Sequence, residues 1–104
     1  MPWVEVMKTS QIGVGEIKQI VMNDDEKIAL FHLDDGFYAI DDTCSHAESS
    51  LAEGEIVGQK VKCALHGAEF DIRTGEVRAF PAVVGVKKYE TKVENDAVFI
   101  NYEG

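Results

Sequence analysis

Two short segments of the sequence each pair a cysteine with a histidine. One residue separates Cys44 from His46, two separate Cys63 from His66, and residues 47–62 lie between the pairs. Thiolate and imidazole are common protein ligands for iron and zinc. Two loops that each offer one sulfur and one nitrogen can hold a compact metal centre from two sides. The spacing therefore indicates a metal site, rather than the disulfide that two cysteines would suggest in a secreted domain.

Two kinds of metal centre fit this ligand set. Zinc fingers usually place both cysteines in one pair and both histidines in the other, whereas each pair here is mixed. A [2Fe–2S] cluster with two cysteines on one iron and two histidines on the other suits mixed pairs, because each loop then reaches both irons. A zinc ion that stabilises a small binding module remains the alternative.

Other chemistry-bearing residues have simpler interpretations. The remaining histidine, His32, lies in the apolar run 30–33 and is expected to be a hydrogen-bonded sheet histidine rather than a ligand. No acid or oxyanion motif accompanies the cysteines, so a nucleophilic role is disfavoured. Acidic residues around the first pair are expected to be solvated turn residues, or, as the alternative, part of a docking surface for a basic partner. They are Asp41, Asp42, Glu48 and Glu53.

Composition limits the protein class. The chain has 104 residues, of which 45% are hydrophobic and 28% charged, as expected of one globular domain spanning 1–104. A net charge of -9 disfavours nucleic-acid and anionic-membrane partners and favours protein partners with a basic patch. The sequence shows neither a basic start followed by an apolar run nor an apolar stretch long enough for a membrane span. We therefore expect a soluble, cytoplasmic protein.

Short runs rich in β-branched and aromatic residues predict an all-β, antiparallel sandwich or barrel. The run 27–33 is nearly all apolar and should be a central strand, and Asp35-Gly36 after it predicts a hairpin turn. Residues 41–58 are predicted to be loop-like. Residues from about 42 to 81 should form a smaller module set into the β framework. The predicted strands are 3–7, 17–22, 27–33, 37–40, 60–63, 69–72, 88–93 and 98–102.

The two ligand pairs resemble the C-x-H…C-x-x-H pattern of Rieske proteins. The segments 51–54, 68–71 and 74–75 extend the similarity, and Phe80-Pro81-Ala82 looks like the proline loop of that family. The pattern is most similar to the soluble ferredoxins of bacterial ring-hydroxylating dioxygenases. The resemblance implies a Rieske fold, in which an antiparallel base carries a small cluster-binding subdomain. It also implies a [2Fe–2S] cluster on Cys44, His46, Cys63 and His66.

The same resemblance implies an electron carrier rather than an enzyme. Such a monomeric ferredoxin takes single electrons from a flavin-dependent ferredoxin reductase and passes them to a terminal oxygenase of aromatic hydrocarbon catabolism. The chain has no room for a nucleotide site or a mononuclear iron site of its own. A small subunit of a multi-subunit oxidoreductase, such as assimilatory nitrite reductase, is the second alternative. Some of those proteins lack the cluster ligands, whereas this chain keeps all four.

The sequence also departs from the Rieske proteins of respiratory complexes. Their two additional cysteines, which bridge the loops, correspond to Ser49 and Leu65. Their serine and tyrosine hydroxyls near the cluster correspond to Ala68 and Phe70. Hydrogen bonds to cluster or cysteine sulfur stabilise the reduced state. We therefore expect a potential towards the low end of the Rieske range of about −150 to +300 mV.

Overall fold

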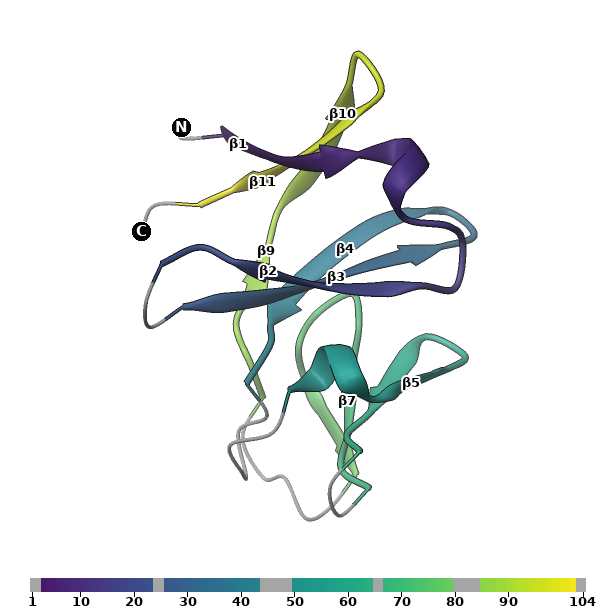
Figure 1. Cartoon of the computed structure of the whole chain (residues 1–104). Helices are drawn as coiled ribbons and strands as arrows, with labels where there is room; N and C mark the ends of the chain where they lie inside the picture. The colour runs from purple at the N-terminus through teal and green to yellow at the C-terminus, as the bar shows by residue number, and fades with distance from the viewer. Residues whose placement is uncertain (1–2, 24–25, 44–49, 65–66, 80–84, 103–104) are drawn as a thin grey trace.

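The computed structural model describes residues 3–23, 26–43, 50–64, 67–79 and 85–102, which form three antiparallel sheets (Figure 1). This arrangement confirms the all-β prediction. The first sheet has the order β1 (Trp3–Lys8), β11 (Ala97–Asn101), β10 (Thr91–Glu94). The second has the order β2 (Ile17–Val21), β3 (Lys27–Leu33), β4 (Gly36–Asp41), β9 (Lys88–Tyr89). The third has the order β5 (Glu55–Val57), β6 (Lys60–Lys62), β7 (Glu69–Asp71), β8 (Val77–Ala79).

Two short 3-10 helices complete the described elements. The helix η1 (Thr9–Gln11) follows β1, and η2 (Leu51–Glu53) precedes β5. Within the described ranges, no helix has the length and apolar character needed to cross a membrane.

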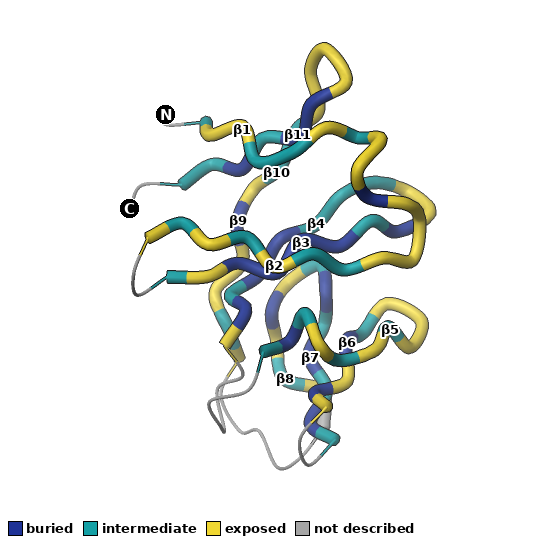
Figure 2. Tube along the Cα trace, in the orientation of Figure 1, coloured by how far each residue is buried: buried dark blue, intermediate teal, exposed yellow. Residues whose placement is uncertain are grey.

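Strand β3 is the centre of the molecule, as predicted from its apolar run. Ile28 and Leu30 on one face pack into a core with Val98 and Ile100 of the first sheet. Residues on the other face, including Phe31, pack into a second core with residues of the third sheet. Because successive side chains of a strand point to opposite faces, a strand that serves two cores must be apolar at nearly every position. Figure 2 shows β3 buried along most of its length.

The second core joins the third sheet to the rest of the fold. Its buried members come from β3, β4, η2 and the third sheet with its adjoining turns. They are Ala29, Phe31, Leu33, Ile40, Leu51, Val61, Cys63, Ala68, Phe70 and Ile72. The third sheet therefore packs against the same strands that carry the first core on their opposite face (Figure 1).

One predicted strand was wrong, and two observed strands were not predicted. The predicted strand 88–93 is two strands: β9 pairs with β4, and β10 pairs with β11 in another sheet. The chain changes sheet at Glu90, whose carbonyl accepts a hydrogen bond from the backbone N–H of Asn101 (2.9 Å). Charged and uncharged residue types alternate from Lys88 to Val93, so the sequence pattern imitates one strand, although Val93 is exposed. The predicted loop 41–58 contains η2 and β5, and β8 was not predicted, whereas the equally short β6 and β7 were. Three residues carry little alternation, so strands of this length are only partly recognised from the sequence.

Candidate metal centre

Of the four predicted ligands, the structure describes Cys63. Cys44, His46 and His66 lie outside the described residues. Cys63 follows directly after β6 and is buried, with 2% of its surface exposed, and its thiol is in no disulfide among the described residues. The predicted four-ligand set therefore remains a prediction, and the described part of the site is its framework.

The turn that carries Cys63 is closed by its own backbone. The Cys63 N–H donates to the carbonyl of Ala68 (2.7 Å), so the chain reverses direction between β6 and β7 within this short span. Cys63 packs in the second core with Phe70 and Leu51. The sulfur-bearing residue thus sits on a rigid, apolar base.

A surface hollow of about 270 Å³ lies beside Cys63. Gly54 and Lys62 line it on two sides. A Cβ atom on Gly54 would lie 2.1 Å from the carbonyl oxygen of Lys62, so only glycine allows η2 to approach β6 this closely. This contact explains the glycine at the end of the segment 51–54. The other lining residues are Glu53, Glu55, Cys63, Ala64 and Gly67.

The segment that carries Cys44 and His46 is held at both ends by described residues. Thr43 pairs with Ser50 in an isolated antiparallel bridge. The backbone N–H of Leu51 donates to the carbonyl of Asp42 (2.6 Å). Since Leu51 is buried in the same core as Cys63, the bases of the two ligand segments share one packing unit.

Asp42 corrects a prediction made from the sequence. It was expected to be a solvated turn residue, but only 2% of its surface is exposed. Its carboxylate accepts hydrogen bonds from Gln19 Nε2 (2.8 Å), Ser50 Oγ (2.8 Å) and the Ala52 N–H (2.9 Å). These donors replace the water that a buried carboxylate loses, which is why the residue can be buried. The neighbouring Asp41 is half-buried and accepts a hydrogen bond from the Tyr89 hydroxyl (2.6 Å).

Two backbone hydrogen bonds hold the chain just after the segment 80–84, which contains the predicted proline loop. The N–H of Val86 donates to the carbonyl of Gly75 (2.8 Å), and the N–H of Asp41 donates to the carbonyl of Lys87 (2.9 Å). Gly75 has a φ of +80°, and a Cβ there would lie 2.1 Å from the Val86 carbonyl oxygen. Phe80 and Pro81 lie outside the described residues.

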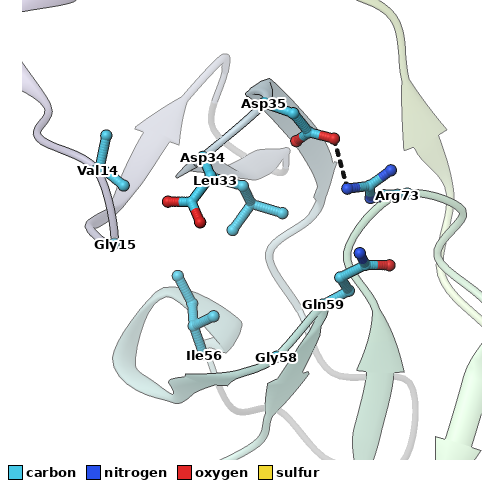
Figure 3. Close-up of a pocket in the computed structure, with 9 residues that line it drawn as sticks. All are labelled: Val14, Gly15, Leu33, Asp34, Asp35, Ile56, Gly58, Gln59 and Arg73. Carbon is cyan, nitrogen blue, oxygen red and sulfur yellow. Dashed lines mark hydrogen bonds and ion pairs between the residues drawn. The ribbon is translucent and has the colours of Figure 1, made fainter.

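A second hollow, of about 300 Å³, separates the third sheet from the turn between β3 and β4 (Figure 3). At its edge the guanidinium of Arg73 contacts the Asp35 carboxylate (2.5 Å) and lies over the Tyr38 ring, 5.2 Å from its centroid. Among the described residues, its lining contains no cysteine or histidine. The residues are Val14, Gly15, Leu33, Asp34, Asp35, Ile56, Gly58, Gln59 and Arg73. The Arg73 contacts join the third sheet to strand β4 and to the turn before it.

His32 is a sheet histidine, as predicted. Its Nδ1 lies 2.9 Å from the Ile12 carbonyl, and its ring stacks on Phe37 with centroids 4.0 Å apart. The sequence reading did not single out the Asp42 network, Arg73 or Gly54 as residues that shape the site. For Arg73 and Gly54 the partners lie in other elements, so no short sequence pattern identifies them.

Comparisons with known proteins agree with the described framework. The sequence model of the Rieske [2Fe-2S] domain matches residues 2–90. The ferredoxin component of biphenyl 2,3-dioxygenase from Rhodococcus jostii (strain RHA1) is 34% identical over 104 residues, covering 100% of this chain and 96% of that protein. A solved structure described as a complex of reduced oxygenase and oxidized ferredoxin in carbazole 1,9a-dioxygenase matches with a TM-score of 0.89 and 31% identity. That match covers 94% of this chain and 91% of the matched chain.

A more distant structure shares the fold alone. It is described as a putative NADH-dependent nitrite reductase small subunit from Mycobacterium tuberculosis. Its TM-score is 0.86 at 18% identity, with 99% of this chain and 96% of that chain covered.

Proposed function

The chain belongs to the family of Rieske [2Fe–2S] domains, and from this premise we propose that it is a ferredoxin, an electron carrier rather than an enzyme. It takes one electron at a time from a flavin-dependent reductase and passes it to a terminal oxygenase. The observation that carries the proposal is similarity to a dioxygenase ferredoxin component along all of this chain and 96% of that protein. The related ferredoxin that was solved together with its oxygenase supports the choice of electron acceptor.

The cofactor of the chain is a Rieske-type [2Fe–2S] cluster. When bound, such a cluster supplies reversible one-electron transfer. We assign Cys44 and Cys63 to one iron and His46 and His66 to the other, within a cluster-binding subdomain of about residues 42–81 in the single domain 1–104. The surroundings of Cys63 support this assignment: the thiol is buried, in no disulfide among the described residues, and held at the end of a strand.

The chain contributes a dry, rigid base to this site. Leu51, Ala68 and Phe70 are fully buried around Cys63 and exclude water from its backbone side. Neither Ala68 nor Phe70 carries a hydroxyl, so neither side chain can donate a hydrogen bond to sulfur. A potential low in the Rieske range follows, which suits the reduction of an oxygenase rather than a respiratory role.

The remaining features fit a transient carrier. The net charge of -9 favours brief, salt-sensitive encounters with partners that present basic surfaces. We propose a soluble, cytoplasmic monomer that acts in an aromatic-compound dioxygenase system. The likeness to a nitrite reductase small subunit supports the fold alone, so that role stays the weaker alternative.

The first experiment measures iron, acid-labile sulfide and zinc in anaerobically purified protein, with EPR spectra before and after reduction by dithionite. We expect about two irons per chain and a rhombic signal in the reduced sample, as a [2Fe–2S] centre with histidine ligands requires. The variants Cys63→Ser and His66→Gln should lose this signal, whereas the control His32→Gln should keep it. Zinc without iron in the native protein would instead establish a zinc-stabilised binding module.

The second experiment tests the carrier role itself. The reduced protein is mixed with the oxidised oxygenase of a biphenyl dioxygenase system, and cluster absorbance is followed by stopped flow. Reoxidation that slows as salt is raised is expected of a charge-steered encounter. Reoxidation no faster than in the absence of the oxygenase would contradict an oxygenase-coupled carrier, and co-purification with a permanent partner would favour the subunit alternative.

A further inference from the structure

We propose that the buried carboxylate of Asp42 is a positioning residue for the metal centre: with Gln19 and Ser50 it fixes both ends of the segment that carries Cys44 and His46. The inference rests on the proposed function, because it concerns how firmly the chain holds the cluster assigned there.

Burial is the first argument. Asp42 is the one charged residue among those described that is buried. An ionised carboxylate is costly to remove from water unless hydrogen bonds replace its hydration. Here Oδ2 accepts from Gln19 Nε2, and Oδ1 accepts from both Ser50 Oγ and the Ala52 N–H, each at 2.8–2.9 Å. Such charge-assisted bonds are stronger than those between neutral groups.

The placement of these donors is the second argument. Gln19 belongs to β2, whereas Ser50 and Ala52 lie where the chain returns from the first ligand segment. Gln19 Nε2 also lies 3.2 Å from Ser50 Oγ, so the three side chains form one closed network. The Asp42 carboxylate therefore connects β2 to Ser50, at the C-terminal end of the segment. The Asp42 backbone itself lies at the N-terminal end.

The backbone reinforces the same point. The Asp42 N–H donates to the Lys27 carbonyl (3.0 Å), and the Asp42 carbonyl accepts from the Leu51 N–H (2.6 Å). Together with the bridge between Thr43 and Ser50, these bonds close the segment at its base. Cys44 is two residues beyond Asp42, and His46 is four residues before Ser50. The freedom of both ligands is therefore limited by two fixed points.

The other half of the ligand set is held separately. The turn at Cys63 is closed by the bond between the Cys63 N–H and the Ala68 carbonyl, which does not involve Asp42. Loosening the Asp42 network should therefore affect the first pair of ligands and leave the second in place. This predicts faster loss of the cluster without unfolding of the third sheet.

The chain offers a matched control one residue away. Asp41→Asn removes the same charge, and its side-chain oxygen can still accept the hydrogen bond from the Tyr89 hydroxyl. Asp42→Asn instead replaces one acceptor oxygen with an NH₂ group that faces existing donors. A long-range effect of charge would appear in both variants, whereas an effect of positioning would appear only at Asp42.

The test uses cluster-loaded wild-type protein and four variants: Asp42→Asn, Asp41→Asn, Ser50→Ala and Gln19→Ala. Cluster release to an iron chelator is followed by visible absorbance, and EPR spectra of the reduced proteins are compared. We expect release from Asp42→Asn to be about tenfold faster or more, because buried donors lose their acceptor. Its EPR spectrum should be shifted or broadened. Ser50→Ala and Gln19→Ala should show smaller changes of the same kind, and Asp41→Asn should match wild type.

Two results would overturn the inference. The first is an Asp42→Asn protein with the release rate and EPR spectrum of Asp41→Asn. The second, decisive if Asp42→Asn does not fold, is wild-type behaviour of both Ser50→Ala and Gln19→Ala. Iron and sulfide are first measured in the wild-type protein. A wild type without a cluster would refute the proposed function, whereas either result above, in a wild type that holds a cluster, would refute only the role of Asp42.

Discussion

Gly75 is the position where a single methyl group should disturb the fold most specifically. Its φ of +80° lies in the left-handed region, and a Cβ there would lie 2.1 Å from the backbone oxygen of Val86. Gly58 offers a matched comparison, because its φ is +64° but no atom lies within 4 Å of its Cβ position. Alanine at both positions therefore separates the strain of the backbone angle from the clash with a neighbouring chain segment.

The expected energies follow from these two geometries. A left-handed alanine costs about 1–2 kcal/mol in either variant. At Gly75 the clash is with backbone, which cannot rotate away as a side chain would, and overpacking of this kind costs about 1–3 kcal/mol more. Moving Val86 also weakens its 2.8 Å hydrogen bond to the Gly75 carbonyl, a loss of about 1 kcal/mol. Gly75→Ala should thus destabilise by about 3–6 kcal/mol and Gly58→Ala by about 1–2 kcal/mol.

Thermal unfolding followed by circular dichroism at one scan rate compares the two variants. One kcal/mol corresponds to roughly 4–8 °C in a domain of this size, so Gly75→Ala should melt at least about 8 °C below Gly58→Ala. Because Gly75 and Val86 close the segment 80–84, Gly75→Ala should also release the cluster faster. Melting temperatures within about 4 °C of each other would show that the approach of Val86 is not the constraint we describe.

Three further predictions concern stability and potential. Burial raises the pKa of Tyr89, and its hydrogen bond to Asp41 adds to the rise, so unfolding releases a proton above about pH 10. The free energy of unfolding, measured by urea titration, should therefore fall as pH increases above 10, and should fall less in Tyr89→Phe. An equally steep fall in the variant would contradict this. A double-mutant cycle of Arg73→Ala and Asp35→Ala should give a coupling below about 1 kcal/mol, because both side chains are more than a third exposed; a larger value would mean that the contact is shielded from water. Ala68→Ser should raise the midpoint potential by tens of millivolts, roughly, if its hydroxyl reaches sulfur; a redox titration with no rise would show that it does not.

The sequence predicted those features of the fold that depend on local pattern. The run 27–33 indicated a central strand because it is apolar at successive positions, and the structure gives the reason, since β3 has a core on each face. The segment 98–102 was predicted to be a strand in which Val98, Ile100 and Tyr102 share a face, and Val98 and Ile100 are fully buried in β11. Both patterns arise within one strand, so neighbouring residues carry the information.

Features that depend on distant partners were not predictable in this way. The change of sheet at Glu90 occurs within a continuous alternation of charged and uncharged residue types, so nothing in residues 88–93 marks it. Nothing near Gly75 in the sequence marks its constraint, because that constraint comes from Val86, eleven positions later. The four-ligand set stays a prediction; it follows from local spacing, because each cysteine lies close to a histidine in the sequence, whereas the framework around Cys63 is assembled from several elements.

Asp41 and Asp42 show which features local sequence can predict and which it cannot. Asp42 directly follows β4, two residues after the fully buried Ile40, so an extended chain would place both side chains on the same side. The sequence alone nevertheless favours a solvated turn, because burying a carboxylate is unfavourable unless donors surround it, and two adjacent aspartates precede a polar segment. The donor from Gln19 lies 23 residues away in another strand. Because its donors are distant in the sequence, the burial of Asp42 cannot be predicted from neighbouring residues. The same donors allow Asp42 to hold the ends of a ligand segment.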